Sequence, residues 1–125
     1  MKTILTVEES QRLIELGVDP KLASVQQSPY KVIPHLRSVE IPENPVFTFI
    51  DILTILPKEI IADTIMGEDF PCALTIRWDE NRKGWHCAYE CLPIPLNVGE
   101  SPELIDALYQ LLIWCLENKI KLNKD

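Results

Sequence analysis

The chain has 125 residues, of which 19 are acidic and 12 are basic, so its formal charge at neutral pH is −7. Apolar residues make up 46% and charged residues 25%, which is typical of globular proteins and excludes extensive disorder. Nucleic-acid binding is disfavoured, because an acidic surface repels phosphates. A chain of this length fits one core, so we expect a single domain over residues 1–125.

The distribution of apolar runs predicts a cytoplasmic protein without a membrane partner. The N-terminal residues turn polar after Leu5, whereas a signal peptide needs an apolar run of about 7–15 residues. The longest apolar run, residues 111–116, is far shorter than the roughly 20 residues of a membrane span. In the cytoplasm the four cysteines are expected to be reduced thiols.

The first predicted helix begins after Thr6. Thr6 and Glu9 have the spacing of a capping box, in which each side chain bonds the backbone of the other residue. Gly17 is placed to end the helix with a positive φ, and Pro20 prevents its continuation. The apolar stripe of this helix consists of Val7, Leu13, Ile14 and Leu16.

Residues 18–47 carry several prolines and give the weakest pattern. Residues 30–33 form a short β-type run that the flanking prolines would confine to a sheet edge. We expect the rest to be ordered loop. An irregular stretch of this length is unusual in a compact domain, which leaves room for an element that the pattern does not identify.

The second predicted helix runs from Phe49 to Leu56. Thr48 is its expected cap with Asp51 at the third helical position, and Pro57 closes it. Apolar residues occupy nearly its whole circumference, so we expect it to be buried on most sides.

Two alternating segments, residues 72–78 and 85–91, predict a β-hairpin around a polar loop that ends at Gly84. Pairing Trp78 with Trp85 puts eight apolar side chains of the two strands on one face, and we expect both tryptophans in the core. The opposite face would hold Thr75, Arg77, His86 and Glu90 in water. The apolar face comprises Cys72, Leu74, Ile76, Trp78, Trp85, Cys87, Tyr89 and Cys91.

A lone hairpin is only marginally stable in water, so a third strand is expected to join it. The candidate residues for this strand are Ile60, Ile61 and Ile65. Together these elements predict an α+β fold. We expect a small antiparallel sheet that consists of the hairpin 72–78/85–91 and can take one more strand. Three helices would pack on one face of this sheet.

The last predicted helix has Ser101 as its cap and Pro102 at its first position. Leu104, Leu108, Leu111 and Cys115 form its apolar stripe, and Glu103, Asp106, Gln110 and Glu117 form the opposite one. Ile113 and Trp114 fall at the margins of the polar stripe, where exposed apolar side chains are typical of protein–protein contacts. The candidate protein interface therefore consists of Ile113, Trp114, Gln110 and Glu117.

No metal site is expected from the cysteines and histidines. Cys87 and Cys91 would lie about 13 Å apart along one strand, and His86 would point to the other face. Cys72 and Cys91 are the remaining close pair, and two ligands do not make a structural site. Whether this pair forms a cross-strand disulfide under oxidation is left open.

The sequence also predicts no catalytic residue and no cofactor. His35 and His86 are the two histidines, and neither a nucleophile turn nor a glycine-rich phosphate loop accompanies them. We expect His86 to be a solvated surface residue. An enzyme would need a cleft that gathers His35 or His86 with carboxylates.

Residues 47–60 and 101–118, together with residues 5–9 and the pair Leu16-Gly17, resemble a family of small proteins encoded by phages and integrated elements of gut Bacteroidetes. That family has no assigned activity, so the resemblance implies a mobile-element context and no mechanism.

Residues 74–112 are also similar to the partial ribonuclease-H-like domain of HicB-type antitoxins. The shared plan is a strand, Gly84-Trp85, a second strand, Leu92-Pro93, and residues 99–101 before a helix. The chain departs from that pattern because it lacks the proline-glycine step after the strand and a basic DNA-binding segment at the C-terminus.

The sequence thus predicts a non-enzymatic interaction protein, an accessory factor of a mobile element. We expect a homodimer or another protein partner at the last helix, and no small-molecule ligand. The alternative is an antitoxin-type neutraliser that binds a basic partner through its acidic surface.

Overall fold

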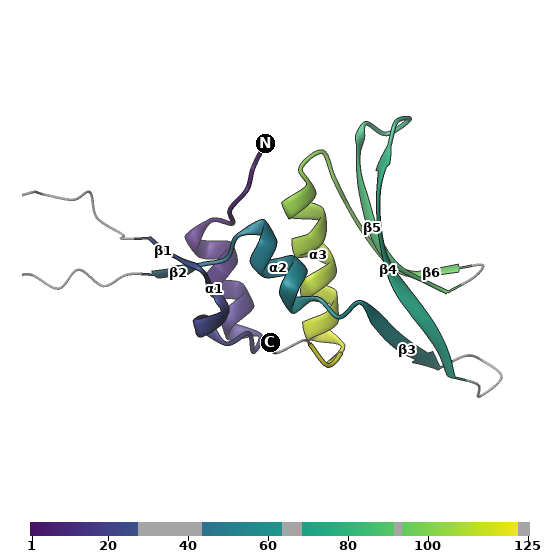
Figure 1. Ribbon diagram of the computed structural model, residues 1–125, viewed down its shortest axis with the longest axis horizontal. Helices are drawn as coiled ribbons and strands as arrows, with labels where there is room; N and C mark the ends of the chain where they lie inside the picture. The colour runs from purple at the N-terminus through teal and green to yellow at the C-terminus, as the bar shows by residue number, and fades with distance from the viewer. Residues whose placement is uncertain (28–43, 64–68, 92–93, 123–125) are drawn as a thin grey trace, which may run out of the picture.

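The computed structural model shows three α-helices and two antiparallel sheets, which confirms the α+β class (Figure 1). It describes residues 1–27, 44–63, 69–91 and 94–122. The elements are α1 (Val7–Glu15), the 3-10 turn η1 (Pro20–Leu22), β1 (Val25–Gln27), β2 (Asn44–Val46), α2 (Phe49–Ile55), β3 (Glu59–Asp63), β4 (Asp69–Asp79), β5 (Gly84–Cys91), β6 (Ile94–Ser101) and α3 (Leu104–Glu117).

The main sheet has the strand order β3-β4-β5-β6, and all three helices lie on one side of it (Figure 1). Among the helices, α3 packs directly on the sheet, against β5 and β6. Helix α2 packs on α3, and α1 packs on β2 still farther from the sheet. The face of the sheet that α3 covers is called the inner face below, and the opposite face the outer face.

Both predicted capping boxes are present. The Thr6 hydroxyl accepts from the Glu9 N–H at 3.1 Å, and the Glu9 carboxylate accepts from the Thr6 N–H at 3.0 Å. Gly17 follows α1 with a φ of 121°, a value that side chains rarely allow. Thr48 and Asp51 exchange the equivalent bonds at 3.2 and 2.9 Å. The two N-terminal helices therefore begin where local hydrogen bonding favours a start.

The expectation that α2 is buried on most sides holds for most of its apolar residues, but it is wrong at Ile50. Ile52 and Ile55 are buried, but Ile50 is 60% exposed. Helix α2 packs on α3, and Phe49 and Leu53 are partly buried against the core.

The segment predicted as loop contains an additional pair of strands. Val25 pairs with Val46 and Gln27 with Asn44, so β1 and β2 form a short antiparallel ribbon. Ser10 in α1 holds this ribbon, because its buried hydroxyl accepts from the Phe47 N–H at 3.2 Å. The predicted strand at residues 30–33 lies outside the described residues.

The predicted hairpin register is confirmed. Trp78 lies opposite Trp85, and Leu74 lies opposite Tyr89. Strand β3 supplies the third strand through Ile60 and Ile61, whereas Ile65 lies outside the described residues.

A further strand, β6, was not predicted, so the sheet has four strands and not two or three. Ser101 pairs with Trp85 as the last residue of β6, which makes its predicted role as helix cap wrong. Helix α3 begins at Leu104 instead, after Glu103, whose side chain makes no capping bond. The strand pairing holds Ser101 extended and delays the helix.

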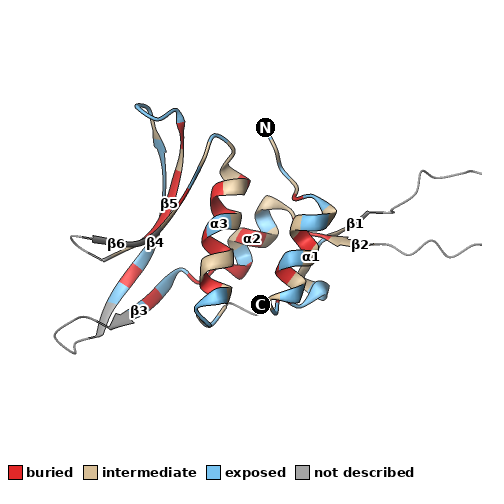
Figure 2. Ribbon diagram, turned by 180° about the vertical axis from the view of Figure 1, so that it is seen from behind, coloured by how far each residue is buried: buried red, intermediate tan, exposed pale blue. Residues whose placement is uncertain are grey.

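The core lies between the inner face of the sheet, α3 and α2 (Figure 2). Gly99 allows α3 to approach β6 closely, since a Cβ at this position would overlap the carbonyl oxygen of Ala107. Tyr89 is fully buried and donates to the Pro57 carbonyl at 2.6 Å, which joins β5 to the end of α2.

Candidate functional site at the hairpin tip

The two tryptophans of the hairpin form a partly exposed pair. The ring centroids of Trp78 and Trp85 are 5.5 Å apart, and their planes meet at 73° in an edge-to-face contact. Trp78 is 45% exposed and Ile76 is 38% exposed, so the expectation of a fully covered apolar face is wrong at this end. The reason is the position of α3, which packs on β5 and β6 and leaves the tip of β4 uncovered.

The orientation of Trp78 is fixed by neighbouring side chains. Its indole Nε1 donates to the Glu80 carboxylate at 2.7 Å, while its ring rests against Trp85. An exposed aromatic ring that is held on two sides loses little freedom when a partner covers it. We call the surface of Ile76, Trp78 and Trp85 the tryptophan face.

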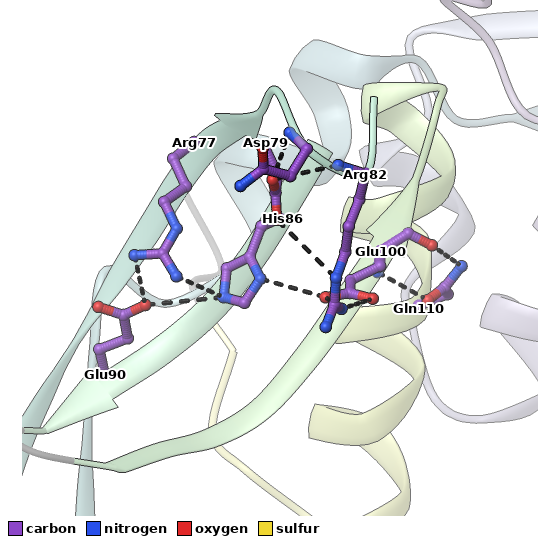
Figure 3. Close-up of polar contacts among 8 residues, drawn as sticks. Arg77, Asp79, Arg82, His86, Glu90, Glu100 and Gln110 are labelled. Atoms are coloured by element: carbon purple, nitrogen blue, oxygen red, sulfur yellow. Dashed lines mark hydrogen bonds and ion pairs between the residues drawn. The ribbon is translucent and has the colours of Figure 1, made fainter. Parts of the chain in front are cut away.

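On the outer face of the same tip, charged side chains surround His86 (Figure 3). The Arg82 Nη1 atom donates to both oxygens of Glu100, at 2.7 and 2.9 Å. His86 Nδ1 lies 3.4 Å from Glu100 Oε1, and His86 Nε2 lies 3.7 Å from Glu90 Oε1. Arg77 lies within 3.5 Å of both His86 and Glu90. We call these five residues the charged cluster.

His86 is not the solvated residue that the sequence predicted, because its relative exposure is 9%. Strand β5 is central, and the register places Arg77 on one side of His86 and Glu100 on the other. Both imidazole nitrogens therefore face charged partners of this chain. Cationic and anionic groups are already paired across the cluster, so the arrangement is a preorganised mixed-charge surface.

A cavity of about 160 Å³ lies at the tip. Its lining includes Arg82, His86 and Glu100 of the charged cluster, together with Trp85 and Pro102. The cavity lies at the junction of β6 and α3. Its lining has cationic, anionic and aromatic groups, which suits contact with a protein side chain.

The residues of the predicted last-helix interface have different surroundings. Gln110 is exposed, but its amide accepts from the Glu100 N–H and donates to the Glu100 carbonyl, each at 3.0 Å. Trp114 is partly buried with its ring 6.4 Å from that of Tyr89, and Ile113 also packs on the core. Glu117 is exposed. Gln110 thus binds its own chain, whereas Ile113 and Trp114 are partly exposed.

The predicted thiol and metal chemistry can be followed in part. Burial raises the pKa of Cys87 to about 12 and the pKa of Cys115 to about 11, so both thiols are protonated at neutral pH. Cys72 is buried, while the side chain of Cys91 and all of His35 lie outside the described residues. The question of a disulfide between Cys72 and Cys91 therefore stays open. Where side chains are described, no three metal-ligating groups converge.

None of the helices in the described part of the chain has the length and apolar character that crossing a bilayer requires. Comparison of the chain with protein families, with curated proteins and with solved structures gave no match.

Sequence reasoning missed Arg82 and Glu100 because their meeting depends on β6. Pro95 and Gly99 interrupt the alternation of residues 94–101, and such residues usually argue against a strand. One signal was available in the sequence. Gly99 lies between Val98 and Glu100, and an isolated glycine inside a strand pattern indicates that another part of the backbone approaches closely.

Proposed function

We propose that the protein is a non-enzymatic binding protein that recognises another protein through the hairpin tip. The observation that supports this most directly is Trp78, a large aromatic side chain 45% exposed and held in place by Trp85 and Glu80. Exposed tryptophans with apolar neighbours and nearby arginines are typical of the residues that dominate binding energy at interfaces.

The charge of the chain bears on the kind of partner. A second copy would bring a charge of −7 toward another −7, whereas a partner with a basic surface would be attracted. We therefore favour a different protein over a homodimer. The mobile-element context that the sequence resemblance implies belongs to the same proposal, with the protein as an accessory factor.

The proposal is tested with two matched variants. Trp78→Ser removes the exposed ring at the tip, and Ile50→Ser removes an exposed apolar side chain on α2. A partner is purified by its affinity for the wild-type protein. Calorimetry then measures its binding to the wild type and to each of the two variants. We expect Trp78→Ser to weaken binding by about tenfold or more, as for a central interface residue, and Ile50→Ser to leave it unchanged. Equal affinities for the three proteins would contradict the proposal.

A homodimer that forms through α3 is an alternative within this proposal. It is supported by the partial exposure of Ile113 and Trp114. Light scattering on wild type, Trp114→Glu and Trp78→Ser separates the two surfaces. A wild-type dimer that Trp114→Glu dissociates and Trp78→Ser does not would move the interface to α3. If the wild-type protein is a monomer at both low and high salt, a homodimer is excluded.

An antitoxin-type neutraliser is the second candidate function. The HicB resemblance implies a hairpin followed by a helix. Strands β4 and β5 form that hairpin, and β6 intervenes before α3. The net charge of −7 suits a basic toxin. Co-expression should then relieve the toxicity of a neighbouring gene product, and the complex should weaken as salt rises. A salt-insensitive complex would argue against this function.

A further inference from the structure

The two edges of the main sheet differ. At the β6 edge, the Gln110 amide pairs with the N–H and the carbonyl of Glu100, so that this part of the edge is closed. At the other edge, the Leu74 N–H donates to the Lys58 carbonyl at 2.8 Å. In an antiparallel pair such bonding alternates, so the backbone groups of Glu59 and Ile61 point away from β4. They have no hydrogen-bonding partner among the residues that the structure describes.

A groove runs beside this open edge. It has a volume of about 460 Å³ and lies between residues 57–61 and residues 119–122, which follow α3. Ile60 lies on the strand side, and Ile120 and Leu122 lie on the other side. Ile61 is 60% exposed at the same edge. The groove therefore has apolar side chains on both sides and borders unpaired backbone groups.

The segment after α3 is held in place beside the groove. Lys119 has a φ of 55°, which lets the chain reverse, and the Ile120 N–H donates to the Cys115 carbonyl at 2.8 Å. The Lys119 N–H donates to the Leu116 carbonyl at 3.2 Å, and these two bonds make a Schellman-type ending. Both Ile120 and Leu122 pack on the core. The groove wall is thus a fixed part of the fold.

The charges around the groove are opposite to the charge of the whole chain. Two exposed lysines, Lys119 and Lys121, line it, against Glu59 on the strand. A second copy is a poor occupant. A second copy paired through the same edge would bring its own Lys119 and Lys121 toward this groove, and like charges repel each other.

We infer that the open edge of β3 accepts an extended acidic segment of another protein as an added strand. The Glu59 and Ile61 backbone groups would bond the segment, as edge strands do in recognition by strand addition. An apolar side chain would enter the groove beside Ile60, and carboxylates would face Lys119 and Lys121. This surface is separate from the hairpin tip, and the inference does not rest on the function proposed for that site.

The test uses a capped, fluorescent hexapeptide that alternates glutamate and valine, with a lysine–valine peptide as the charge-reversed control. Binding to the full chain is followed by fluorescence anisotropy, and the amides of Glu59 and Ile61 are followed by hydrogen exchange. We expect the acidic peptide to bind, the basic peptide to bind at least about fivefold more weakly, and exchange at both amides to slow.

Two variants locate the binding. Ile61→Pro removes an N–H that β4 does not use, and the double variant Lys119→Glu/Lys121→Glu reverses the charge of the groove wall. Each should weaken binding of the acidic peptide by about fivefold or more. Trp78→Ser is the control and should leave this binding unchanged. If Ile61→Pro does not fold, the lysine variant and the exchange data decide. Equal binding of the two peptides, binding that both variants leave intact, or no binding at about 1 mM peptide would overturn the inference.

Discussion

Gly99 sets the distance between β6 and α3. A Cβ there would overlap the Ala107 carbonyl and lie 3.3 Å from the Gln110 Cβ, so Gly99→Ala must push the helix off the strand. We expect a loss of about 1–3 kcal/mol in the free energy of unfolding, measured by urea titration. Gly84→Ala is the control and should cause a smaller loss, because its Cβ would lie 3.2 Å from the Ser101 carbonyl oxygen and would not overlap it. An effect of Gly84→Ala equal to or larger than that of Gly99→Ala would contradict this packing.

Asp51 caps α2 and also binds Ser24, which precedes β1. Burial of the carboxyl raises its pKa, but the N–H groups of Thr48 and Ser24 and then their hydroxyls outweigh it, so the pKa of Asp51 is lowered. A lowered pKa in the folded state means that ionised Asp51 stabilises the fold above its ordinary value of about 3.9. That stabilisation is lost as the pH falls through the folded-state pKa.

Asp51→Ala should therefore cost about 1–2 kcal/mol in the free energy of unfolding at neutral pH. The difference from wild type should shrink at pH values below about 4, and urea titrations followed by circular dichroism measure it. Glu15→Ala removes an exposed carboxylate at the end of α1 and serves as the control. A difference that stays constant into strong acid would show that the charge of Asp51 is not involved.

At the scale of elements, Gln110 links α3 to the edge of β6. Gln110→Ala removes both bonds to the Glu100 backbone, and we expect a loss of about 0.5–1.5 kcal/mol and faster exchange of the Glu100 amide. Glu117→Ala on the same helix is the control for the loss of an exposed polar side chain. If the Glu100 amide exchanges equally fast in wild type and Gln110→Ala, the edge is not closed by this side chain.

The elements that could be predicted are those specified by neighbouring residues. Thr6 with Glu9 and Thr48 with Asp51 define helix starts within four residues, and the hairpin register follows from side-chain alternation. The start of α3 could not be predicted in the same way. Ser101 and Pro102 have the pattern of a helix start, but pairing of Ser101 with Trp85 across β6 overrides that local preference.

At the scale of the whole molecule, the candidate site depends on how the layers cover one another. The sequence puts Trp78 and Trp85 on the apolar face, and the structure agrees, but their exposure is decided by where α3 lies. Similarly, the burial of His86 requires Glu100 from a strand that the pattern did not identify. Face and register could be read from periodicity, whereas coverage is a tertiary property.

Photo-crosslinking in cells shows directly whether the hairpin tip binds a foreign protein. Asn81 in the exposed hairpin loop and Ile50 on α2 are replaced, one at a time, by a photoreactive benzophenone amino acid. We expect a covalent adduct with a different protein from position 81 and none from position 50. Adducts from position 50 alone, adducts with a second copy of this chain, or no adduct from position 81 would contradict this expectation.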